Sequence, residues 1–386
     1  MARKRRTKTA GGGIDISLFI TLMIMLAFGL IMVFSASAPS AFYEEGNQLY
    51  YIKKQLVWTA IGLVAMFFIS NVNYKLVKKY AGLFCAAAFV LMVLVILMGV
   101  TGGGAQRWIK IGGVTLQPSE IAKFALILLF AKKLSEQPQK RLRHFSGGLT
   151  PYLFLIAVFC GAMVLQDHLS AAIITAATLI VMLAVAGADL KQLFVLMIVG
   201  VAIAIPLVFF EGYRANRIKA YLDPFAYKDS IGWQIVEGLY AIGSGGIFGR
   251  GLGQSRQKFL YVPEAHNDYI YAILCEELGL MGAIIVMVLF AVFITRCIKI
   301  ALAAPDKFSS LSVFGITTLI GFQYIINIGV VTGVIPNTGM QLPFFSAGGS
   351  SLVFMLAAMG FVFNVSRYVK KEEEIPKGEL LSLIHI

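Results

Sequence analysis

The residues best suited to chemistry lie in one stretch, from about Gly212 to Asp268. The stretch mixes aromatic side chains with basic ones, and its candidate ligand-binding cations are Arg214, Arg217, Arg250 and Lys258. Arginine can pair two N–H groups with the oxygens of one diphosphate, and aromatic rings stack on the faces of sugars. Asp268, at its end, could act as a general base. We therefore expect a groove or lid for a ligand that carries both negative charge and sugar.

Other interpretations of this stretch remain open. It could be a solvated loop with aromatics at the lipid headgroups, and residues 231–242 could form a short interfacial helix. Asp268 could be an acid at a helix N-terminus, where the helix dipole favours it. His266 could orient Asp268 or cap the turn. The Gly-rich runs 243–246 and 249–253 follow no strand and open no long helix, so nucleotide binding is not expected.

Ionisable residues also occur within apolar segments. Glu120 and Lys123 are three residues apart, on one face of a helix. Charges inside a membrane segment are costly and point to function, although this pair could equally be a structural ion pair. Glu276 and Glu277 could face a water-filled cavity. The run 166–168, Gln-Asp-His, is as consistent with a turn cap as with a site.

The elements that must position these residues are membrane helices. Of the 386 residues, 58% are hydrophobic and only 14% are charged, which excludes a soluble globule and a disordered chain. A membrane-spanning helix needs about 20 mostly apolar residues. Such segments lie at about 14–36, 55–71, 80–100, 116–132, 149–166, 169–188, 191–211, 269–298, 309–332 and 349–367. The sequence predicts an all-α polytopic membrane protein with ten transmembrane helices and one long extracytoplasmic loop between helices 7 and 8.

The positions of the basic residues predict the orientation. Twenty-one of the 33 lysines and arginines fall on the side that holds both termini, and seven fall in the long outer loop. Positive charge marks the cytoplasmic side in short loops, so both termini should be cytoplasmic. We expect a basic N-terminus at 1–13, a single membrane domain at 14–368 with an outer loop at about 212–268, and a flexible tail at 369–386. The four cysteines lie in or beside spans and predict neither a disulfide nor a metal site.

Several motifs together resemble one family. Residues 258–272 read KFLYVPEAHNDYIYA, residues 336–351 read PNTGMQLPFFSAGGSS, and residues 117–123 read QPSEIAK. With RWI at 107–109 and GSGG at 243–246, their order over residues 14–367 is similar to that of the SEDS family, whose members are FtsW, RodA and SpoVE. Two positions depart from it: residues 166–171 read QDHLSA where many members have EPDLGT, and Ala347 replaces a common Tyr.

This resemblance implies a bacterial peptidoglycan glycosyltransferase in the cytoplasmic membrane, with its active site facing outside. Such enzymes polymerise lipid II and work with a class B penicillin-binding protein, among the membrane proteins of the divisome or elongasome. The resemblance makes Asp268 the catalytic acid and places Glu120 and Lys123 in a central cavity. Further substrate-binding candidates from the matched motifs are Arg107, Glu264, His266, Ser346 and Ser350. A division or sporulation role is favoured over elongation, and nucleic acid is not expected as a partner.

The implied reaction inverts an α-linked diphosphate into a β-glycosidic bond, so a single displacement with one base is sufficient. Asp268 would take the proton of the acceptor 4-hydroxyl, and the outer-loop cations would stabilise the leaving diphosphate. A divalent cation, Mg or Mn, could share that role, although no ligand cluster indicates one. Two alternatives remain: a flippase or transporter for the lipid-linked precursor, and a non-catalytic scaffold for a penicillin-binding protein.

Overall fold

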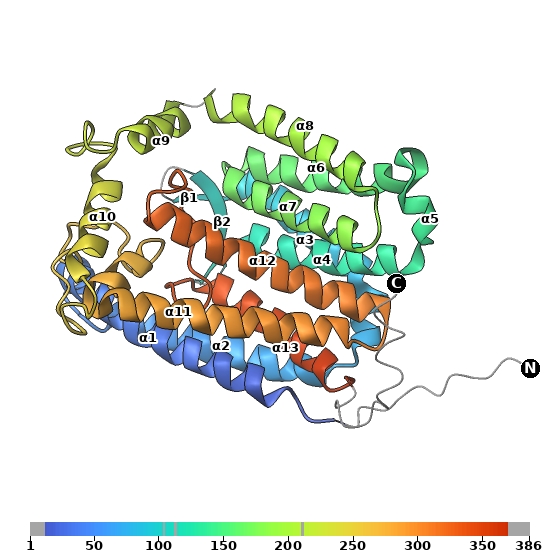
Figure 1. The fold of residues 1–386 in the computed structure, drawn as a ribbon, viewed down its shortest axis with the longest axis horizontal. Helices are drawn as coiled ribbons and strands as arrows, with labels where there is room; N and C mark the ends of the chain where they lie inside the picture. The colour runs from blue at the N-terminus through green and yellow to red at the C-terminus, as the bar shows by residue number, and fades with distance from the viewer. Residues whose placement is uncertain (1–11, 103–104, 112–113, 210–211, 370–386) are drawn as a thin grey trace, which may run out of the picture.

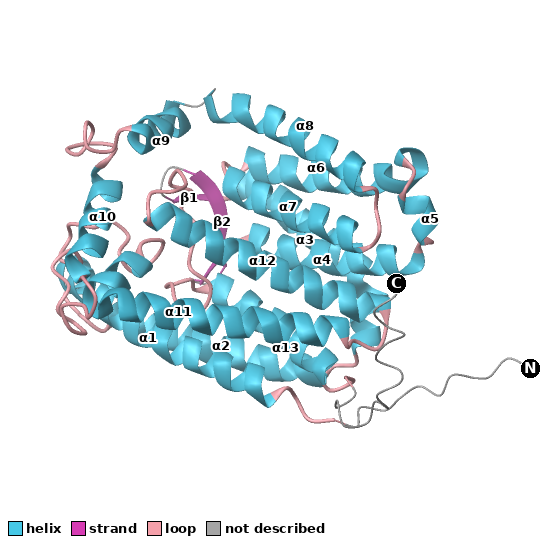
Figure 2. Cartoon of the chain, in the orientation of Figure 1, coloured by secondary structure: helices cyan, strands magenta, loops and turns pink. Residues whose placement is uncertain are grey.

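The computed structural model describes residues 12–102, 105–111, 114–209 and 212–369. Nearly all of the basic N-terminus predicted at 1–13 and of the tail predicted at 369–386 lies outside these residues. Most of the described chain is helical, and the long helices run side by side in a bundle (Figures 1 and 2).

Each of the ten expected segments coincides with a helix. These are α1 (Ile16–Glu45), α2 (Tyr50–Asn71), α3 (Tyr74–Met98), α4 (Pro118–Glu136), α6 (Thr150–Leu165), α7 (Leu169–Val185), α8 (Leu190–Phe209), α11 (Ile270–Leu302), α12 (Lys307–Val331) and α13 (Ser350–Ser366). Six of the described helices are long and apolar enough to cross a membrane: α1, α2, α3, α11, α12, and α6 together with the π-helical turn η1 (Phe145–Leu149) that precedes it. Helices α7 and α13 and the described apolar part of α8 are shorter. The chain is therefore a multi-pass membrane protein, and its ten crossings remain a prediction.

Small residues let the helices approach closely. Helix α13 packs along α2, where a Cβ on Gly360 would strike the backbone of Met66, and one on Gly62 would strike Leu356. Close backbone approach through small residues is a general feature of packed membrane helices. Other neighbouring pairs are α3 with α4, α11 with α12, and α6 with α7.

The first and last helices begin and end at the same end of the bundle. The backbone N–H of Asp15, before α1, donates to Ser366 Oγ at the end of α13, 3.2 Å away. Arg296, near the end of α11, donates to the same aspartate at 2.7 Å. The segment 212–268 lies at the opposite end, on the left of Figure 1. This arrangement agrees with an even number of crossings between the two ends.

The expected outer loop contains two helices. Helix α9 (Gly212–Leu222) was not predicted, and α10 (Trp233–Gly245) lies close to the short helix expected at 231–242. A small antiparallel sheet joins α3 to α4, with strands β1 (Val100–Gly102), β2 (Ala105–Ile111) and β3 (Val114–Leu116) in the order β1-β2-β3. A short helix, α5 (Gln139–Leu142), follows α4. The sequence did not predict the sheet, because its strands are short and lie between glycines, without a long alternating pattern.

Helix α11 is broken at Gly279, which has φ 65° and ψ −162°. The break frees backbone groups, and the glycine-rich segment after α10 pairs with them. Arg250 N–H donates to Glu276 O at 3.0 Å, and Gly251 N–H donates to Glu277 O at 2.9 Å. Beyond the break, Leu280 N–H donates to Gly246 O at 2.9 Å. Segment 212–268, called the outer segment after its expected location, is thus fixed to α11 by backbone groups that the break leaves without partners in the helix.

Replacing Gly279 by alanine should lower the melting temperature of the purified protein. Its backbone lies in a region that side chains rarely adopt, at a cost of about 1–3 kcal/mol. In addition, the new Cβ would strike the backbone of Gly249 and Ile247. Gly321→Ala is the matched control, because its Cβ would meet only Ile294 Cδ1 at an ordinary 3.7 Å. Equal melting temperatures for both variants would show that the break in α11 does not require a glycine at residue 279.

Candidate active site

Asp268 lies two residues before α11, where the outer segment meets the bundle. Its side chain is buried, with 9% of the residue exposed. Asn327 of α12 fixes the backbone here, since its Nδ2 donates to Asp268 O at 2.8 Å and to Met340 O at 2.7 Å. Among the described residues, no group donates a hydrogen bond to Asp268 Oδ1. Asn327 thus holds the backbone at Asp268, and one buried oxygen of the carboxylate has no hydrogen-bond partner in the described chain.

Burial raises the pKa of Asp268 to about 7. The nearby Glu264 carboxylate adds to the increase, while the backbone N–H of Asp268 itself and the Arg217 guanidinium act in the opposite direction. A carboxylate with a pKa near the working pH is a stronger base than an ordinary one, and about half of it is ionised there. This environment suits proton transfer better than that of a solvated aspartate.

The loop before α13 is bonded to the segment that carries Asp268. Ser346 Oγ donates to Asn267 O at 2.5 Å, and Ala347 N–H donates to His266 O at 3.0 Å. The His266 ring lies against Tyr51 of α2, with 4.4 Å between ring centroids. Burial lowers the pKa of His266, although the carboxylates of Glu264 and Glu44 act in the opposite direction. Within the described chain, the ring makes no hydrogen bond to Asp268. His266 therefore supports the segment by ring contact and through its backbone.

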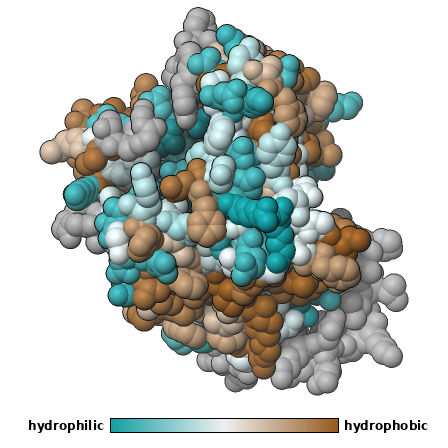
Figure 3. Space-filling model, turned by 90° about the vertical axis from the view of Figure 1, so that its left-hand side faces the viewer, coloured by the Kyte–Doolittle hydropathy of each residue, from teal (hydrophilic) through white to brown (hydrophobic). Residues whose placement is uncertain are grey.

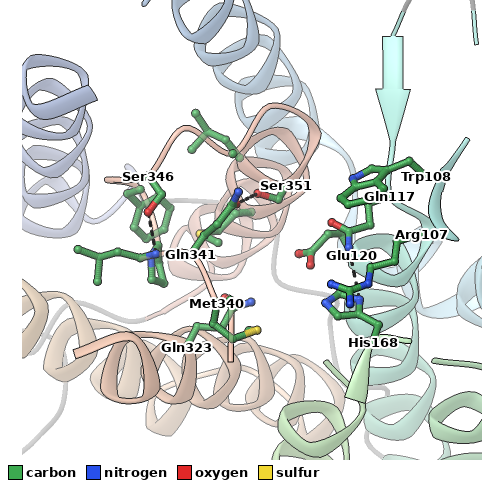
Figure 4. Close-up of a pocket in the computed structure, with 17 residues that line it drawn as sticks. Arg107, Trp108, Gln117, Glu120, His168, Gln323, Met340, Gln341, Ser346 and Ser351 are labelled. Carbon is green, nitrogen blue, oxygen red and sulfur yellow. Dashed lines mark hydrogen bonds between the residues drawn. The ribbon is translucent and has the colours of Figure 1, made fainter. Parts of the chain in front are cut away.

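A polar pocket of about 120 Å³ lies beside Ser346, between two groups of elements (Figure 4). On one side stand β2, α4 and the turn before α7, and on the other stand α12 and the loop 339–348. Its polar lining consists of Arg107, Gln117, Glu120, His168, Gln323, Gln341, Ser346 and Ser351. This volume holds several waters or one polar group of a larger ligand. The lining can both donate and accept hydrogen bonds.

Glu120 and Lys123 form a buried ion pair, with Lys123 Nζ 2.8 Å from Glu120 Oε1. Their side chains are 9% and 1% exposed, and only the Glu120 carboxylate reaches the pocket. The pair is therefore a structural ion pair that also contributes to the pocket, because Lys123 holds the Glu120 carboxylate at the pocket wall.

His168 also faces this pocket and is neutral. Burial lowers its pKa well below the ordinary value, and the cations of Arg107 and Lys123 lower it further. Gln117 Nε2, an amide donor, lies 3.3 Å from His168 Nδ1, and Ser119 Oγ lies 3.0 Å from it. Nδ1 must therefore accept, which leaves the proton on Nε2. The run 166–168 contributes to the pocket as well as forming the turn.

The expected basic residues are not gathered in one place. Arg107 donates to Asp167 O at 2.5 Å and lines the pocket, while Arg217 donates to Asn337 O at 3.1 Å and acts on Asp268 electrostatically. Arg250 is partly exposed, with Nε 3.6 Å from Glu276 Oε1. The side chain of Arg214 lies outside the described residues.

Lys258, predicted as a ligand-binding cation, is instead buried within the protein. It is 4% exposed, and its ammonium group donates to Glu277 Oε1, Ser35 Oγ and Gly253 O. All three N–H groups are used within the protein, so the residue is not available to a diphosphate in this structure. Glu276 and Glu277, which could have faced a water-filled cavity, are instead 1% and 0% exposed and accept hydrogen bonds from protein groups.

The two remaining candidates, Glu264 and Ser350, do not line the pocket. Glu264 is exposed and has a φ of 53°, and its carboxylate accepts from Asn267 Nδ2. Ser350 is buried at the first residue of α13, whereas its neighbour Ser351 lines the pocket.

Sequence reasoning missed three amides at this site: Gln323, Asn327 and Gln341. Gln323 and Asn327 are four residues apart on one face of α12, and both are almost completely buried. Gln323 lines the pocket, and its Oε1 has no hydrogen-bond partner among the described residues. Amides repeated at helical spacing within an apolar segment were the available signal.

The described residues also include possible ligands of a metal ion. Within the described ranges, no group of three histidine, cysteine, aspartate or glutamate side chains is placed to hold an ion. All four cysteines are free.

The described end of the bundle around segment 212–268 has a mixed surface (Figure 3). Hydrophilic residues gather across its centre, and apolar residues lie along its lower edge. The fold and the site therefore define a multi-pass membrane protein with a buried carboxylate and a pocket for a polar group near one end of its bundle.

The comparisons with known proteins identify the family. A family model described as cell cycle protein, FTSW_RODA_SPOVE, matches residues 15–371. Stage V sporulation protein E of Bacillus subtilis is 44% identical over 92% of this chain and 97% of its own length. The probable peptidoglycan glycosyltransferase FtsW of Trichlorobacter lovleyi is 37% identical over 92% of this chain and 94% of its own length. The chain belongs to the FtsW/RodA/SpoVE family and is a glycosyltransferase.

Two solved structures have a similar fold. The rod shape determining protein RodA of Thermus thermophilus has a TM-score of 0.71 at 26% identity, over 93% of this chain and 98% of that one. A chain of a peptidoglycan synthase complex, described for its coordination of polymerization and crosslinking, has a TM-score of 0.78 at 26% identity over 93% of this chain and 99% of that one.

Proposed function

We propose that this protein polymerises lipid II into glycan strands at the outer face of the bacterial cytoplasmic membrane. The observation that carries the proposal is the buried Asp268 carboxylate, with a pKa near 7 and one oxygen without a partner in the described chain. The relatives named as probable peptidoglycan glycosyltransferases support the substrate class. A role in septum or spore-wall synthesis is supported by the likeness to the sporulation and FtsW proteins.

In the proposed reaction, the acceptor 4-hydroxyl oxygen attacks the anomeric carbon of the donor. A C–O bond forms on one face, the bond to the diphosphate oxygen breaks on the other, and the hydroxyl proton passes to Asp268. The product is β-linked because the displacement inverts the α-linked donor. Arg217 acts on Asp268 electrostatically, and we propose it as the cation that meets the leaving diphosphate. Cations at that place stabilise charge developing on the leaving group.

The polar pocket would hold a polar group of the substrate, because it is too small for a whole disaccharide. The Glu120 carboxylate accepts hydrogen bonds, and Arg107 and the Nε2–H of His168 donate them. Ser346 lines this pocket and bonds to Asn267, next to Asp268, so the two parts of the site share one loop. A divalent cation could share the neutralisation of the diphosphates, and dialysis against a chelator before assay tests that requirement.

The orientation follows from the same proposal. Both termini would lie in the cytoplasm after ten crossings, and segment 212–268 would face outside, where the sugars of lipid II are polymerised. A class B penicillin-binding protein is the proposed partner for crosslinking. The likeness to a chain of a peptidoglycan synthase complex supports such a partner.

The experiment is to incubate purified protein in detergent with labelled lipid II and to separate the products by size. Glycan ladders that disappear in Asp268→Ala are expected. Equal ladders from the variant would remove Asp268 as the base. Translocation of the lipid in vesicles without any polymer would favour a flippase. Growth of a deletion strain rescued by Asp268→Ala would favour a scaffold.

A further inference from the structure

A second buried group of charges lies away from the pocket, at the start of α11. Lys258 Nζ is 2.8 Å from Glu277 Oε1, 3.0 Å from Ser35 Oγ and 2.7 Å from Gly253 O. Ser35, from the middle of α1, donates to both Glu277 oxygens at 2.6 and 2.8 Å. The group therefore joins three parts of the chain: α1, the outer segment and α11.

The neighbouring Glu276 fixes the outer segment at the same place. Its carboxylate accepts from Ser255 Oγ at 2.5 Å, Arg256 N–H at 3.0 Å and Gln257 N–H at 3.2 Å. Ser255 Oγ in turn accepts from Lys258 N–H at 3.2 Å. Donors of the protein thus surround both acids. We call Lys258, Glu277, Ser35, Glu276 and Ser255 the clamp.

The clamp closes the piece of chain that carries Asp268. Lys258 is ten residues before Asp268, and Glu277 is nine residues after it. Between them, the side chains of Val262, Ala265 and Tyr269 are buried. Tying the ends of a loop removes alternative positions for its middle. The break at Gly279 directly follows and separates this piece from the rest of α11.

A buried ion pair is an inefficient source of stability, because apolar side chains of similar volume do as well or better. What such a pair adds is one defined arrangement of the chain, because a shift of either partner would leave a buried charge without its counter-charge. Activity that depends on the placement of a carboxylate gains from such a restraint, since a misplacement of about 1 Å can cost roughly 100-fold in rate.

We propose that Lys258 and Glu277 are positioning residues for Asp268, and that their ion pair keeps the Asp268 carboxylate buried where the outer segment meets the bundle. The catalytic part of this inference rests on the proposed function, whereas the positioning part concerns the structure alone. The side chains that act electrostatically with Asp268, which are Glu264, Arg217 and Tyr269, lie outside the clamp. A change in Asp268 on breaking the clamp would therefore come from its position.

The test uses the double variant Lys258→Met/Glu277→Met. Each single change leaves a buried charge unpaired, and such a variant is expected to fold poorly. The double variant removes both charges and keeps side chains of similar length, so it should stay folded and melt higher than either single variant. Lys228→Met, an exposed lysine of the same outer segment, is the matched control.

The first readout does not depend on activity. Asp268→Cys is placed in a background with Cys85, Cys160, Cys275 and Cys297 changed to alanine, and its thiol is labelled with a water-soluble maleimide. The double variant should raise the labelling rate about tenfold, because the segment opens locally. Lys228→Met should leave that rate unchanged. An unchanged rate in the folded double variant overturns the proposal, whatever the activity.

The second readout is polymerisation of labelled lipid II by the double variant with Asp268 present. We expect kcat to fall roughly 10- to 100-fold with little change in KM. The acid limb of the pH profile should also move to lower pH, because a more exposed carboxylate has a lower pKa. A faster labelling rate together with a wild type that makes no glycan would retain the positioning inference and contradict the proposed function.

Discussion

Replacing Asp268 by asparagine should lower lipid II polymerisation by a factor of about 10² to 10⁴, the usual contribution of a positioned general base. Asparagine has the same shape and stays buried, so the substrate should still bind and KM should change little. The amide cannot take the proton of the acceptor hydroxyl. Initial rates of glycan formation from labelled lipid II, at several substrate concentrations, measure this effect.

The same residue should set the acid limb of the wild-type pH profile. Burial raises the pKa of Asp268 to about 7, and the base works only when it is ionised. Activity should therefore increase as the pH is raised, with a midpoint near pH 7, and should be low in more acidic solution. A midpoint near 4 would mean that the carboxylate is solvated in the working enzyme. Asp229→Asn is the control, because it removes an exposed acid from the same outer segment.

Stability should change in the opposite direction to activity. A raised pKa means that the folded protein binds the proton more tightly than the unfolded chain does, so stability falls as pH rises from the ordinary value of 3.8 to about 7. At about 1.4 kcal/mol per pH unit, the ionised Asp268 costs up to roughly 4 kcal/mol above pH 7. Asp268→Asn should therefore melt higher than the wild type at pH 8, with a smaller difference at pH 5. An equal difference at both pH values would show that the cost does not come from ionisation.

Replacing Lys123 by methionine should destabilise the protein by about 3 kcal/mol, the usual cost of removing one partner from a buried ion pair. Lys123 is almost completely buried and lies 2.8 Å from Glu120, so the variant leaves a carboxylate without its cation. Thermal or denaturant unfolding in a fixed detergent measures the loss. Polymerisation should fall as well, because Glu120 lines the pocket and its position depends on Lys123.

The double variant Glu120→Gln/Lys123→Met separates these two effects. It removes both charges, so much of the lost stability should return, while the polar pocket lacks its carboxylate and activity stays low. Lys133→Met serves as a control, since Lys133 is exposed on the same helix. If Lys123→Met were as stable as the wild type, the ion pair would not hold Glu120.

Much of the fold could be predicted, because the membrane simplifies the problem. Every polar backbone group must be satisfied within a span, so long apolar segments have to become helices. All ten expected segments coincide with helices, from α1 to α13. The sheet at 100–116 and α9 could not be predicted, because short elements outside the apolar segments depend on neighbours that the local pattern does not name.

The candidate site was predicted less evenly. Asp268, Glu120 and Ser346 stand out by type, position or motif, and each lies at the site or lines its pocket. Gln323 was missed, because its helical spacing with Asn327 indicates a shared face of α12 but not which neighbours that face meets. Lys258 was misjudged for the opposite reason, since an outer-loop lysine resembles a ligand-binding residue until its partners are known.

The sequence by itself determined the class of protein, the helical segments, the family and the carboxylate at residue 268, because these depend on composition, local periodicity and contiguous motifs. Only the tertiary structure decided which charges are available to a substrate. Lys258 and Glu277 satisfy each other with Ser35, which is 223 residues from Lys258 along the chain. The Asp268 carboxylate is buried with an oxygen that lacks a partner in the described chain. Burial and pairing between distant segments set those states, and no local pattern encodes either one.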